Sequence, residues 1–309
     1  MFPRAVASIA AQTYRPLEVV IVNDGSKDDT AQVAANVAAQ YAGQLEIQVI
    51  NQPNMGVAGA SNTGGDAATG DFLAWLGDDD AWLPGKAEKQ VAAMRAAGAD
   101  AACSYITQRT ANGDVRFPSP AKKLLTGRNP AAYIRGDSYA HICTLLVSRE
   151  IWRQAGPYDR DLRISEDDEW IARVVHLANF VAVEEELAIY EFNQAGLSRV
   201  NSIEQLVKRD ESVELAILRM RQRNQARPNW NEQVWRDRAA KDFDQIVKHL
   251  LYAGQRKLAV SKWRQFMAET QDHPTLVKTR RKLRKAWWLG LVGQRLKHPK
   301  FESNDAIRM

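Results

Sequence analysis

The sequence predicts an α/β protein with a doubly wound, mostly parallel sheet, followed by a helical C-terminal region. Two observations predict this fold class. Between residues 17 and 106, short apolar runs rich in β-branched residues alternate with stretches of helical periodicity, which is typical of a sheet covered by helices. After residue 200 the strand signals end. We therefore predict an α/β domain over residues 1–200 and a helical appendage over residues 201–309.

Local signals set the predicted boundaries in the α/β domain. Pro3 suits the first turn of a helix, Gly43 follows a helix end, and Asn112-Gly113 is typical of a hairpin turn. Helices are predicted at residues 5–12, 26–41, 57–68, 84–97, 149–155 and 166–177. Strands are predicted at residues 17–22, 45–50, 72–76, 100–106, 142–147, 180–183 and 187–190.

The C-terminal region carries helical periodicity only. Its predicted helices cover residues 203–225, 231–252, 256–269 and 275–290. We expect the domain boundary at the break near residues 198–202.

Bulk properties exclude several classes of protein. Apolar residues make up 45% and charged residues 26% of the 309, as in ordinary soluble proteins. Two cysteines, Cys103 and Cys143, are too few for a disulfide framework, so we expect buried free thiols in a reducing compartment. We find no signal-peptide pattern and no apolar run long enough to span a bilayer, and we expect a cytoplasmic location.

Acidic clusters mark three turns or helix starts of the α/β domain. They are Asn23-Asp24-Gly25-Ser26, Asp78-Asp79-Asp80 and Ser165-Glu166-Asp167-Asp168. Taken singly, each cluster is typical of a turn or of a helix N-cap. Because the carboxyl ends of strands in a doubly wound sheet meet along one edge, we expect the clusters to lie close together. Several carboxylates on one edge would bind Mg²⁺ or Mn²⁺, which in turn would bind a diphosphate.

The segments that contain these clusters resemble a known family. They read VVIVNDGSKDDT, NMGVAGASNTGGDAATGDFLAWLGDDDAWLPGKAEKQ and GPYDRDLRISEDDEWIAR. As an ordered set they are similar to the successive motifs of family 2 glycosyltransferases, which have the GT-A fold. The resemblance covers residues 2–199 and implies a GT-A-like, doubly wound mixed sheet that binds a nucleotide sugar.

The resemblance implies roles on the donor side of the site. Asp24 would hydrogen-bond the nucleobase, and Asp78 would lie near the ribose. Asp79 would bind the metal that bridges the diphosphate, with Asp80 as a neighbouring support or an alternative ligand. Asn62 would contact the nucleotide sugar, although the family often has an arginine at the position before it.

The resemblance also implies an acceptor side. Asp167 would be the general base, because inverting transfer needs a carboxylate to take the proton of the attacking hydroxyl. Glu166 would orient Asp167 or an acceptor hydroxyl. Asp159 and Trp82 are further candidates for acceptor binding, with packing as the alternative for Trp82. We expect His141 to be a structural histidine.

Besides Ser61, which stands where the family often has an arginine, the chain departs from the family pattern at two further places. The family's first strand, which reads like VSVIIPTYN, is absent, and we expect a gap between the strands at 17–22 and 72–76. We expect that the recorded start is internal to the true reading frame, or that the gene is truncated. The family's Tyr-Arg-x-His stretch appears as YEFN at residues 190–193, which offers no histidine, and Arg199 is a candidate substitute.

The sequence therefore predicts an inverting, metal-dependent glycosyltransferase. It would move a sugar from a nucleoside diphosphate donor, expected to be UDP-linked, to a hydroxyl of a glycan or lipid-linked acceptor in cell-surface polysaccharide assembly. One alternative is a nucleotidyltransferase, which would usually show a glycine-rich phosphate loop after its first strand. The other is a catalytically degenerate relative that binds a partner or a glycan, which the missing strand and the YEFN stretch favour.

The C-terminal segment carries the positive charge of the chain. The net charge is +5, yet residues 278–300 contain nine Lys or Arg and no Asp or Glu, so the remainder is net acidic. Basic residues interleaved with Trp287, Trp288 and Leu291 suggest a helix in peripheral contact with an anionic membrane, at its inner face. The alternative is a solvated basic helix that packs on the body through an apolar stripe. Nucleic acid is not expected as a partner, because no recognised binding motif appears.

Overall fold

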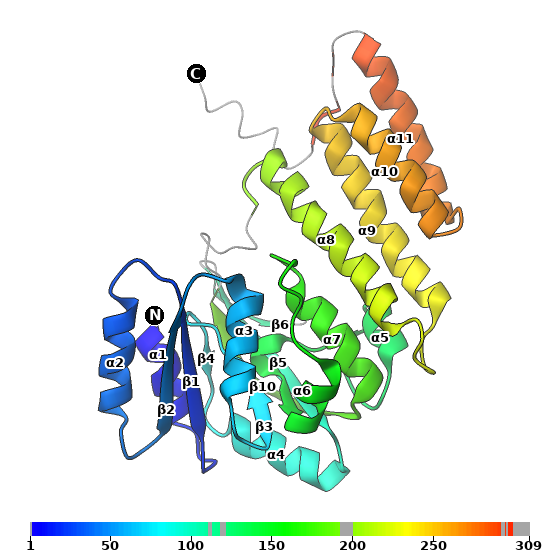
Figure 1. Cartoon of the computed structure of the whole chain (residues 1–309). Coiled ribbons are helices and arrows are strands. Elements are labelled where there is room, and N and C mark those ends of the chain that lie inside the picture. Colours follow the sequence, from blue (N-terminus) through cyan, green and yellow to red (C-terminus); the bar gives the residue numbers. More distant parts are fainter. Residues whose placement is uncertain are drawn as a thin grey trace. The chain divides into compact units, whose positions relative to one another are not determined.

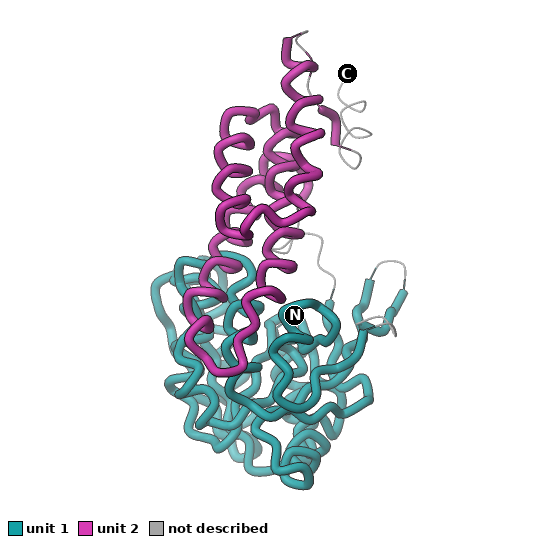
Figure 2. The backbone as a smooth tube through the Cα atoms, turned by 90° about the vertical axis from the view of Figure 1, so that its right-hand side faces the viewer, with its two compact units in different colours: residues 1–194 teal, residues 195–309 magenta. Residues whose placement is uncertain are grey.

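The computed structural model of the chain contains two compact units, residues 1–194 and 195–309 (Figures 1 and 2). It describes residues 2–110, 113–117, 122–191, 200–291, 294 and 296–298. The first unit holds the described strands together with helices, and the described part of the second unit is helical (Figure 1).

The strands of the first unit form three sheets. A two-stranded parallel sheet pairs β1 (Glu18–Asp24) with β2 (Glu46–Gln52). A six-stranded sheet has the order β3-β9-β5-β10-β4, with β6 paired to β5. Its strands are β3 (Phe72–Ala74), β4 (Ala81–Trp82), β5 (Ala101–Thr110), β6 (Gly113–Phe117), β9 (Leu146–Ser148) and β10 (Phe180–Glu191). The short strands β7 (Lys123–Leu124) and β8 (Ser138–Tyr139) pair in parallel.

The six-stranded sheet is mixed, as the resemblance implied, rather than mostly parallel. Only β5 and β10 run parallel in it, while β3, β4, β6 and β9 each pair antiparallel with their neighbours. Two of the predicted strands, at 180–183 and 187–190, are one strand, β10, because bulges between Val183 and Ala188 absorb the irregular register. The predicted strand at 142–147 was wrong in its first half, where the chain forms the 3₁₀ helix η1 (Ile142–Thr144) before β9.

The expected gap lies beside β1. Strands β1 and β3 belong to separate sheets, and no described strand pairs with the second edge of either (Figure 1). A side chain links the two regions instead, since the Glu18 carboxylate accepts hydrogen bonds from the backbone N–H groups of Thr69 (2.7 Å) and Gly70 (3.2 Å), just before β3. One face of β1 and β2 is buried against apolar residues of the first two helices.

The first unit contains seven α-helices among its described residues. They are α1 (Phe2–Ala10), α2 (Thr30–Gln40), α3 (Gly56–Ala67), α4 (Lys86–Ala97), α5 (Pro130–Arg135), α6 (Arg149–Ala155) and α7 (Glu166–Leu177). Six of these lie where the sequence predicted helices, and α5 was missed. Of the predicted hairpin turn, Asn112 lies outside the described residues, while Gly113 begins β6.

The second unit is a set of packed helices. They are α8 (Ile203–Asn224), α9 (Glu232–Tyr252), α10 (Arg256–Glu269) and α11 (Pro274–Leu291) (Figure 1). The side chains of Ser202 and Asn231 cap the first two, which is why those helices begin where they do. The rings of Phe243 and Phe266 stack at 3.9 Å between α9 and α10 in the core. None of the described helices combines the length and apolar character needed to cross a membrane.

Candidate active site

The acidic turn, Asp78 to Asp80, follows β3 and exposes its three carboxylates to different degrees. Asp78 is exposed, Asp79 is half-buried, and Asp80 is only 3% exposed. Gly77 makes room for this turn, since a Cβ atom there would lie 3.0 Å from Asp80 Oδ2 and 3.2 Å from Asp79 Oδ1. The fold thus leaves two carboxylates of the turn within reach of solvent and holds the third inside.

Asp80 is held by two hydrogen bonds. Its Oδ2 accepts from the Cys143 thiol at 2.8 Å, and its Oδ1 accepts from the backbone N–H of Glu191 at 3.1 Å. Burial raises the pKa of Asp80 to about 6. These contacts fit the predicted role of a neighbouring support, whereas direct coordination of a metal would compete with both donors. Sequence reasoning missed Cys143, which it treated only as a buried thiol.

Two arginines pair with Glu191, and one of them, Arg4, also contacts the acidic turn; sequence reasoning missed both. Arg4 of α1 donates to the backbone carbonyl of Asp79 and pairs with the Glu191 carboxylate at 2.6 Å. Arg109 of β5 reaches the same Glu191 oxygen at 3.2 Å. Burial raises the pKa of Asp79, and the charge of Asp78 raises it further. The guanidinium of Arg4 therefore places a positive charge beside the turn, from a helix distant in sequence. Of the other residues named for this region, Phe192, Asn193 and Arg199 lie outside the described residues.

A second group of carboxylates opens α7. Burial raises the pKa of Glu166 to about 7, and the neighbouring charge of Asp167 adds to the effect. Burial likewise raises the pKa of Asp167 to about 6, with a smaller contribution from the charge of Asp168. Tyr133 of α5 donates its hydroxyl to Asp168 at 2.8 Å, which fixes the start of the helix. A carboxylate with a pKa near 6 is ionised at neutral pH and still basic enough to take a proton.

The acidic turn and the start of α7 meet around Cys143 in η1. The pKa of its buried thiol is raised well above the ordinary value, first by burial and then by the charges of Asp80 and Asp167. His141 caps η1, because its Nδ1 accepts from the Cys143 N–H at 3.3 Å, and burial lowers the pKa of His141 to about 4. This neutral, hydrogen-bonded ring fits the expected structural histidine. Asp80 is therefore in contact with Cys143, and Asp167 is near enough to act on the thiol electrostatically, while the meeting of all three clusters stays a prediction.

Asp24 is the third cluster's carboxylate, at the end of β1. It accepts from Gln52 Nε2 at 2.7 Å and from the backbone N–H of Met55 at 2.8 Å, next to the first turn of α3. Gly25 has a φ of +73°, and a Cβ atom there would lie 2.6 Å from the backbone nitrogen of Asn54. Only glycine fits that close approach.

Asn62 of α3 binds the backbone of the loop that precedes α7. Its Nδ2 donates to the carbonyl of Tyr158 at 3.0 Å, and its Oδ1 accepts from the N–H of Tyr158 at 2.7 Å. The amide is thus engaged on both sides with the backbone that precedes α7. Its contact with a nucleotide stays a prediction, and its observed task is to position the loop at Tyr158.

An aromatic cluster joins α7 to β3 and α6. It comprises Trp75, Trp152, Tyr158 and Trp170. Tyr158 stacks on Trp170 at 4.9 Å, and Trp75 lies 5.1 Å from Trp170. Trp170 also donates to the carbonyl of Gly156 at 2.9 Å. Because Trp75 follows β3 and Trp170 belongs to α7, the cluster fixes the strand that leads to the acidic turn against the helix of Asp167.

The two acceptor candidates have structural contacts. Asp159 is 8% exposed, and its Oδ1 accepts from the N–H of Asp161 at 3.0 Å. The indole of Trp82 donates to the Cys143 carbonyl at 3.1 Å, and the Lys86 ammonium lies 4.3 Å from a ring centroid of Trp82. Burial lowers the pKa of Lys86 to about 7. Packing explains Trp82 well, and contact of either residue with an acceptor stays a prediction.

The acidic turn offers a divalent cation only part of a coordination shell. Among the described residues, no group of three or more His, Cys, Asp or Glu side chains is placed to hold a metal ion. Mg²⁺ and Mn²⁺ at phosphate-transfer sites commonly take one or two carboxylates and complete their shells with substrate phosphates and water. The oxygen donors of Asp78 and Asp79, close to solvent and mutually repelling, fit that kind of site.

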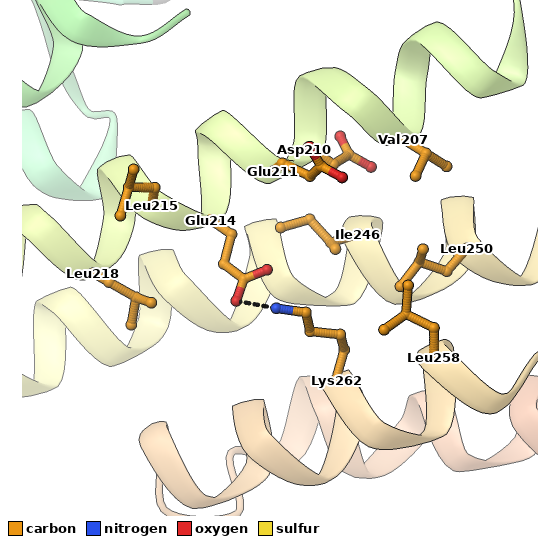
Figure 3. Close-up of a pocket in the computed structure, with 10 residues that line it drawn as sticks. All are labelled: Val207, Asp210, Glu211, Glu214, Leu215, Leu218, Ile246, Leu250, Leu258 and Lys262. Atoms are coloured by element: carbon orange, nitrogen blue, oxygen red, sulfur yellow. Dashed lines mark hydrogen bonds and ion pairs between the residues drawn. The ribbon is translucent and has the colours of Figure 1, made fainter. Parts of the chain in front are cut away.

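A separate cavity of about 430 Å³ lies in the helical unit, between α8, α9 and α10 (Figure 3). Lys262 and Glu214 form an ion pair of 2.6 Å in the lining of this cavity, which also includes Ile246 and Leu250 (Figure 3). It contains none of the predicted site residues.

Comparison with known proteins defines the class. Residues 1–153 match the model described as glycosyl transferase family 2. An uncharacterized glycosyltransferase of Rickettsia prowazekii, RP339, is 30% identical over 177 residues, 54% of this chain and 52% of that protein. The succinoglycan biosynthesis protein ExoW of Rhizobium meliloti is 42% identical over 83 residues, 26% of this chain and 25% of ExoW. The chain spans about half the length of the first curated relatives it matches.

Solved structures resemble the chain over most of its length. S. aureus TarS 1-349 in complex with UDP-GlcNAc has a TM-score of 0.57 at 16% identity, over 94% of this chain and 87% of TarS 1-349. The mannosyltransferase PcManGT of Pyrobaculum calidifontis, in complex with GDP-Man and Mn²⁺, has a TM-score of 0.53 at 14% identity, over 91% and 82%. These likenesses show that the chain has the fold of GT-A glycosyltransferases. Through residues 1–153, the chain belongs to glycosyltransferase family 2.

Proposed function

We propose that the chain is an inverting, metal-dependent glycosyltransferase that transfers a hexose from a nucleoside diphosphate donor, UDP first among them, to a hydroxyl acceptor. The observation that carries the proposal is that Cys143 is hydrogen-bonded to Asp80 of the acidic turn and also feels the charge of Asp167 at the start of α7, in a chain of family 2. We do not propose the nucleotidyltransferase alternative, because residues 1–153 match glycosyltransferase family 2.

The donor side consists of Asp24, Asp78 and Asp79. Asp24 is held rigidly by Gln52 and Met55 and would accept from the nucleobase, while Asp78 would accept from a ribose hydroxyl. TarS with UDP-GlcNAc and PcManGT with GDP-Man and Mn²⁺ support a nucleotide-sugar donor and a divalent cation for this fold. Asp79, with Asp78 beside it, would hold Mn²⁺ or Mg²⁺, and that cation would neutralise charge on the departing diphosphate.

The acceptor side consists of Asp167 and Glu166. In an inverting transfer the acceptor oxygen bonds to the anomeric carbon as the bond from that carbon to the diphosphate oxygen breaks. Asp167 takes the hydroxyl proton, for which its raised pKa of about 6 is suitable. Glu166, with a pKa of about 7, carries a proton for part of the time at neutral pH and so can donate to Asp167 or to the acceptor.

The acceptor is proposed to be a glycan or a lipid-linked glycan in cell-surface polysaccharide assembly on the cytoplasmic side of the membrane. ExoW, named for succinoglycan biosynthesis, supports a polysaccharide. Asp159 and Trp82 are the side chains proposed to line this part of the site.

One observation favours a second candidate, a catalytically degenerate relative that binds a partner or a glycan. The gap beside β1 lies next to Asp24, and Glu191 places a negative charge near the acidic turn. Such a protein would bind without turning over.

Release of UDP from a panel of UDP-hexoses distinguishes the two candidates. With Mn²⁺ and polysaccharide or lipid-linked acceptors, the enzyme should release UDP, and EDTA should stop the release. Binding of UDP and Mn²⁺ without turnover of any donor would favour the degenerate relative. Absence of metal-dependent nucleotide binding would overturn the proposed function.

A further inference from the structure

Helix α11 has two distinct sides. Its buried side consists of Leu276, Thr279, Leu283 and Ala286, spaced three or four residues apart and packed toward α9 and α10. On its other side Trp287, Trp288 and Leu291 are 60%, 68% and 61% exposed. The helix therefore packs on the unit without using its two tryptophans.

The exposed tryptophans stand among basic side chains. Arg280, Arg281, Arg284 and Lys285 are all exposed on α11, and no Asp or Glu occurs between residues 274 and 300. Leu258, 44% exposed at the start of α10, lines the same surface hollow as Trp287 and Leu291. We name this region the Trp–basic surface: Leu258, Arg280, Arg284, Trp287, Trp288 and Leu291.

The Trp–basic surface is fixed in place. Arg256 donates to the backbone carbonyl of Gln294 at 2.6 Å and lies across Gly290, where a Cβ atom would be 2.1 Å from its Nη1. The indole of Trp263 in α10 donates to the Leu276 carbonyl at 2.8 Å. These contacts join both ends of α11 to the rest of the helical unit, so the surface is presented by a folded scaffold.

Solvation alone explains the arginines and lysines but not two adjacent exposed tryptophans. Large aromatic side chains with one polar edge favour the boundary between lipid headgroups and acyl chains, and basic residues around them are attracted to anionic lipids. A partner surface must therefore be anionic and must accept large apolar groups a few ångströms below its charged layer. An anionic phospholipid bilayer has both properties.

We propose that the Trp–basic surface docks the helical unit onto an anionic membrane surface, with Trp287, Trp288 and Leu291 inserted among the headgroups and the arginines paired with lipid phosphates. The inference depends on the helical unit alone and does not require the proposed transferase activity.

Co-sedimentation of the full chain with vesicles tests it. The protein should bind vesicles of phosphatidylcholine mixed with phosphatidylglycerol and should not bind phosphatidylcholine alone, and added salt should weaken binding. Arg280→Gln/Arg284→Gln should weaken binding roughly 30-fold, from about a factor of five for each charge near the surface. Trp287→Ala/Trp288→Ala should reduce binding by at least roughly tenfold.

A matched control removes two charges elsewhere in the same unit. Lys208 of α8 and Lys241 of α9 are exposed, and Lys208→Gln/Lys241→Gln should keep vesicle affinity within about threefold. Circular dichroism and urea unfolding check that each variant is folded. Equal loss in the control, binding unaffected by the tryptophan changes, or equal binding to neutral vesicles would overturn the proposal. Tighter binding to RNA than to anionic vesicles would assign the surface to nucleic acid instead and would also overturn it.

Discussion

The two carboxylate groups of the candidate site differ in how the fold surrounds them. The acidic turn keeps Asp78 exposed and Asp79 half-buried, and only Asp80 is inside, held by Cys143 and Glu191. At the start of α7, burial raises the pKa values of both Glu166 and Asp167. Glu166 and Asp167 are half-buried, as Asp79 is, so exposure alone does not separate the two groups. The groups differ in Asp78, which is open to water and suits a hydrated cation, and in the pKa values of about 7 and about 6 of Glu166 and Asp167, which suit proton transfer.

The largest expected effect comes from removing the proposed general base alone. Asp167→Asn keeps the shape of the side chain and removes its proton acceptor, so sugar transfer should fall roughly 100- to 10,000-fold. The assay is UDP release in the presence of acceptor and Mn²⁺. Asp71→Asn, at an exposed carboxylate just before β3, is the matched control and should keep full activity. A similar loss in both variants would mean that the loss does not come from the proton acceptor at Asp167.

The next largest effect is expected from removing a proposed metal ligand on the donor side. Asp79→Ala removes a proposed metal ligand, so the Mn²⁺ concentration for half-maximal transfer should rise roughly 100-fold. Measuring UDP release over a Mn²⁺ series gives this value, with Asp71→Ala as control. An unchanged Mn²⁺ requirement would show that Asp79 does not hold the cation.

Gly77 offers a purely steric test of the acidic turn. Gly77→Ala places a Cβ atom 3.0 Å from Asp80 Oδ2, so the free energy of unfolding should fall by about 1–3 kcal/mol. Gly64→Ala in α3 is the matched substitution, because its Cβ atom would only touch Val22 at an ordinary 3.5 Å, and it should be neutral or slightly stabilising. Urea unfolding of both variants provides the comparison, and equal effects would contradict the close packing of the turn.

The smallest effect concerns pH. Because the pKa of Asp167 is raised from 3.8 to about 6 in the folded state, ionisation costs stability, and this cost grows as pH rises from about 4 through 6. Asp167→Asn removes the cost, so its gain in unfolding free energy should be about 1 kcal/mol larger at pH 8 than at pH 5. Urea unfolding at both pH values measures the gain. A gain independent of pH would place Asp167 in a less buried setting.

The sequence predicted that the acidic clusters approach one another because strand ends share an edge, but this reason holds only for the acidic turn after β3, since Glu166 and Asp167 open α7 after a loop. The 3₁₀ helix η1 was not predictable from sequence. There the backbone N–H of Cys143 donates to Nδ1 of His141 instead of pairing in the predicted strand. Arg4 and Glu191 were also out of reach of sequence reasoning. They are 187 positions apart, and only the pairing of β10 with β4 and β5 brings Glu191 to the turn.

Burial was the other quantity that the sequence did not supply. Asp78, Asp79 and Asp80 are the same residue type, so the sequence does not show which of them is buried. The burial of Asp80 depends on the small size of Gly77 and on the hydrogen bond from the Cys143 thiol. Asn62 likewise lies in a motif of the family, but only the structure shows that both ends of its amide bind the backbone of Tyr158.

The measurement that tests the separation of roles most directly is calorimetric titration of UDP, with Mn²⁺ present, into the wild-type chain, Asp79→Ala and Asp167→Asn. The proposed roles predict that Asp79→Ala loses metal-dependent UDP binding by roughly 100-fold, while Asp167→Asn binds within about threefold of wild type. Equal loss of UDP affinity in both variants would contradict the assignment of one group to the donor and the other to the acceptor.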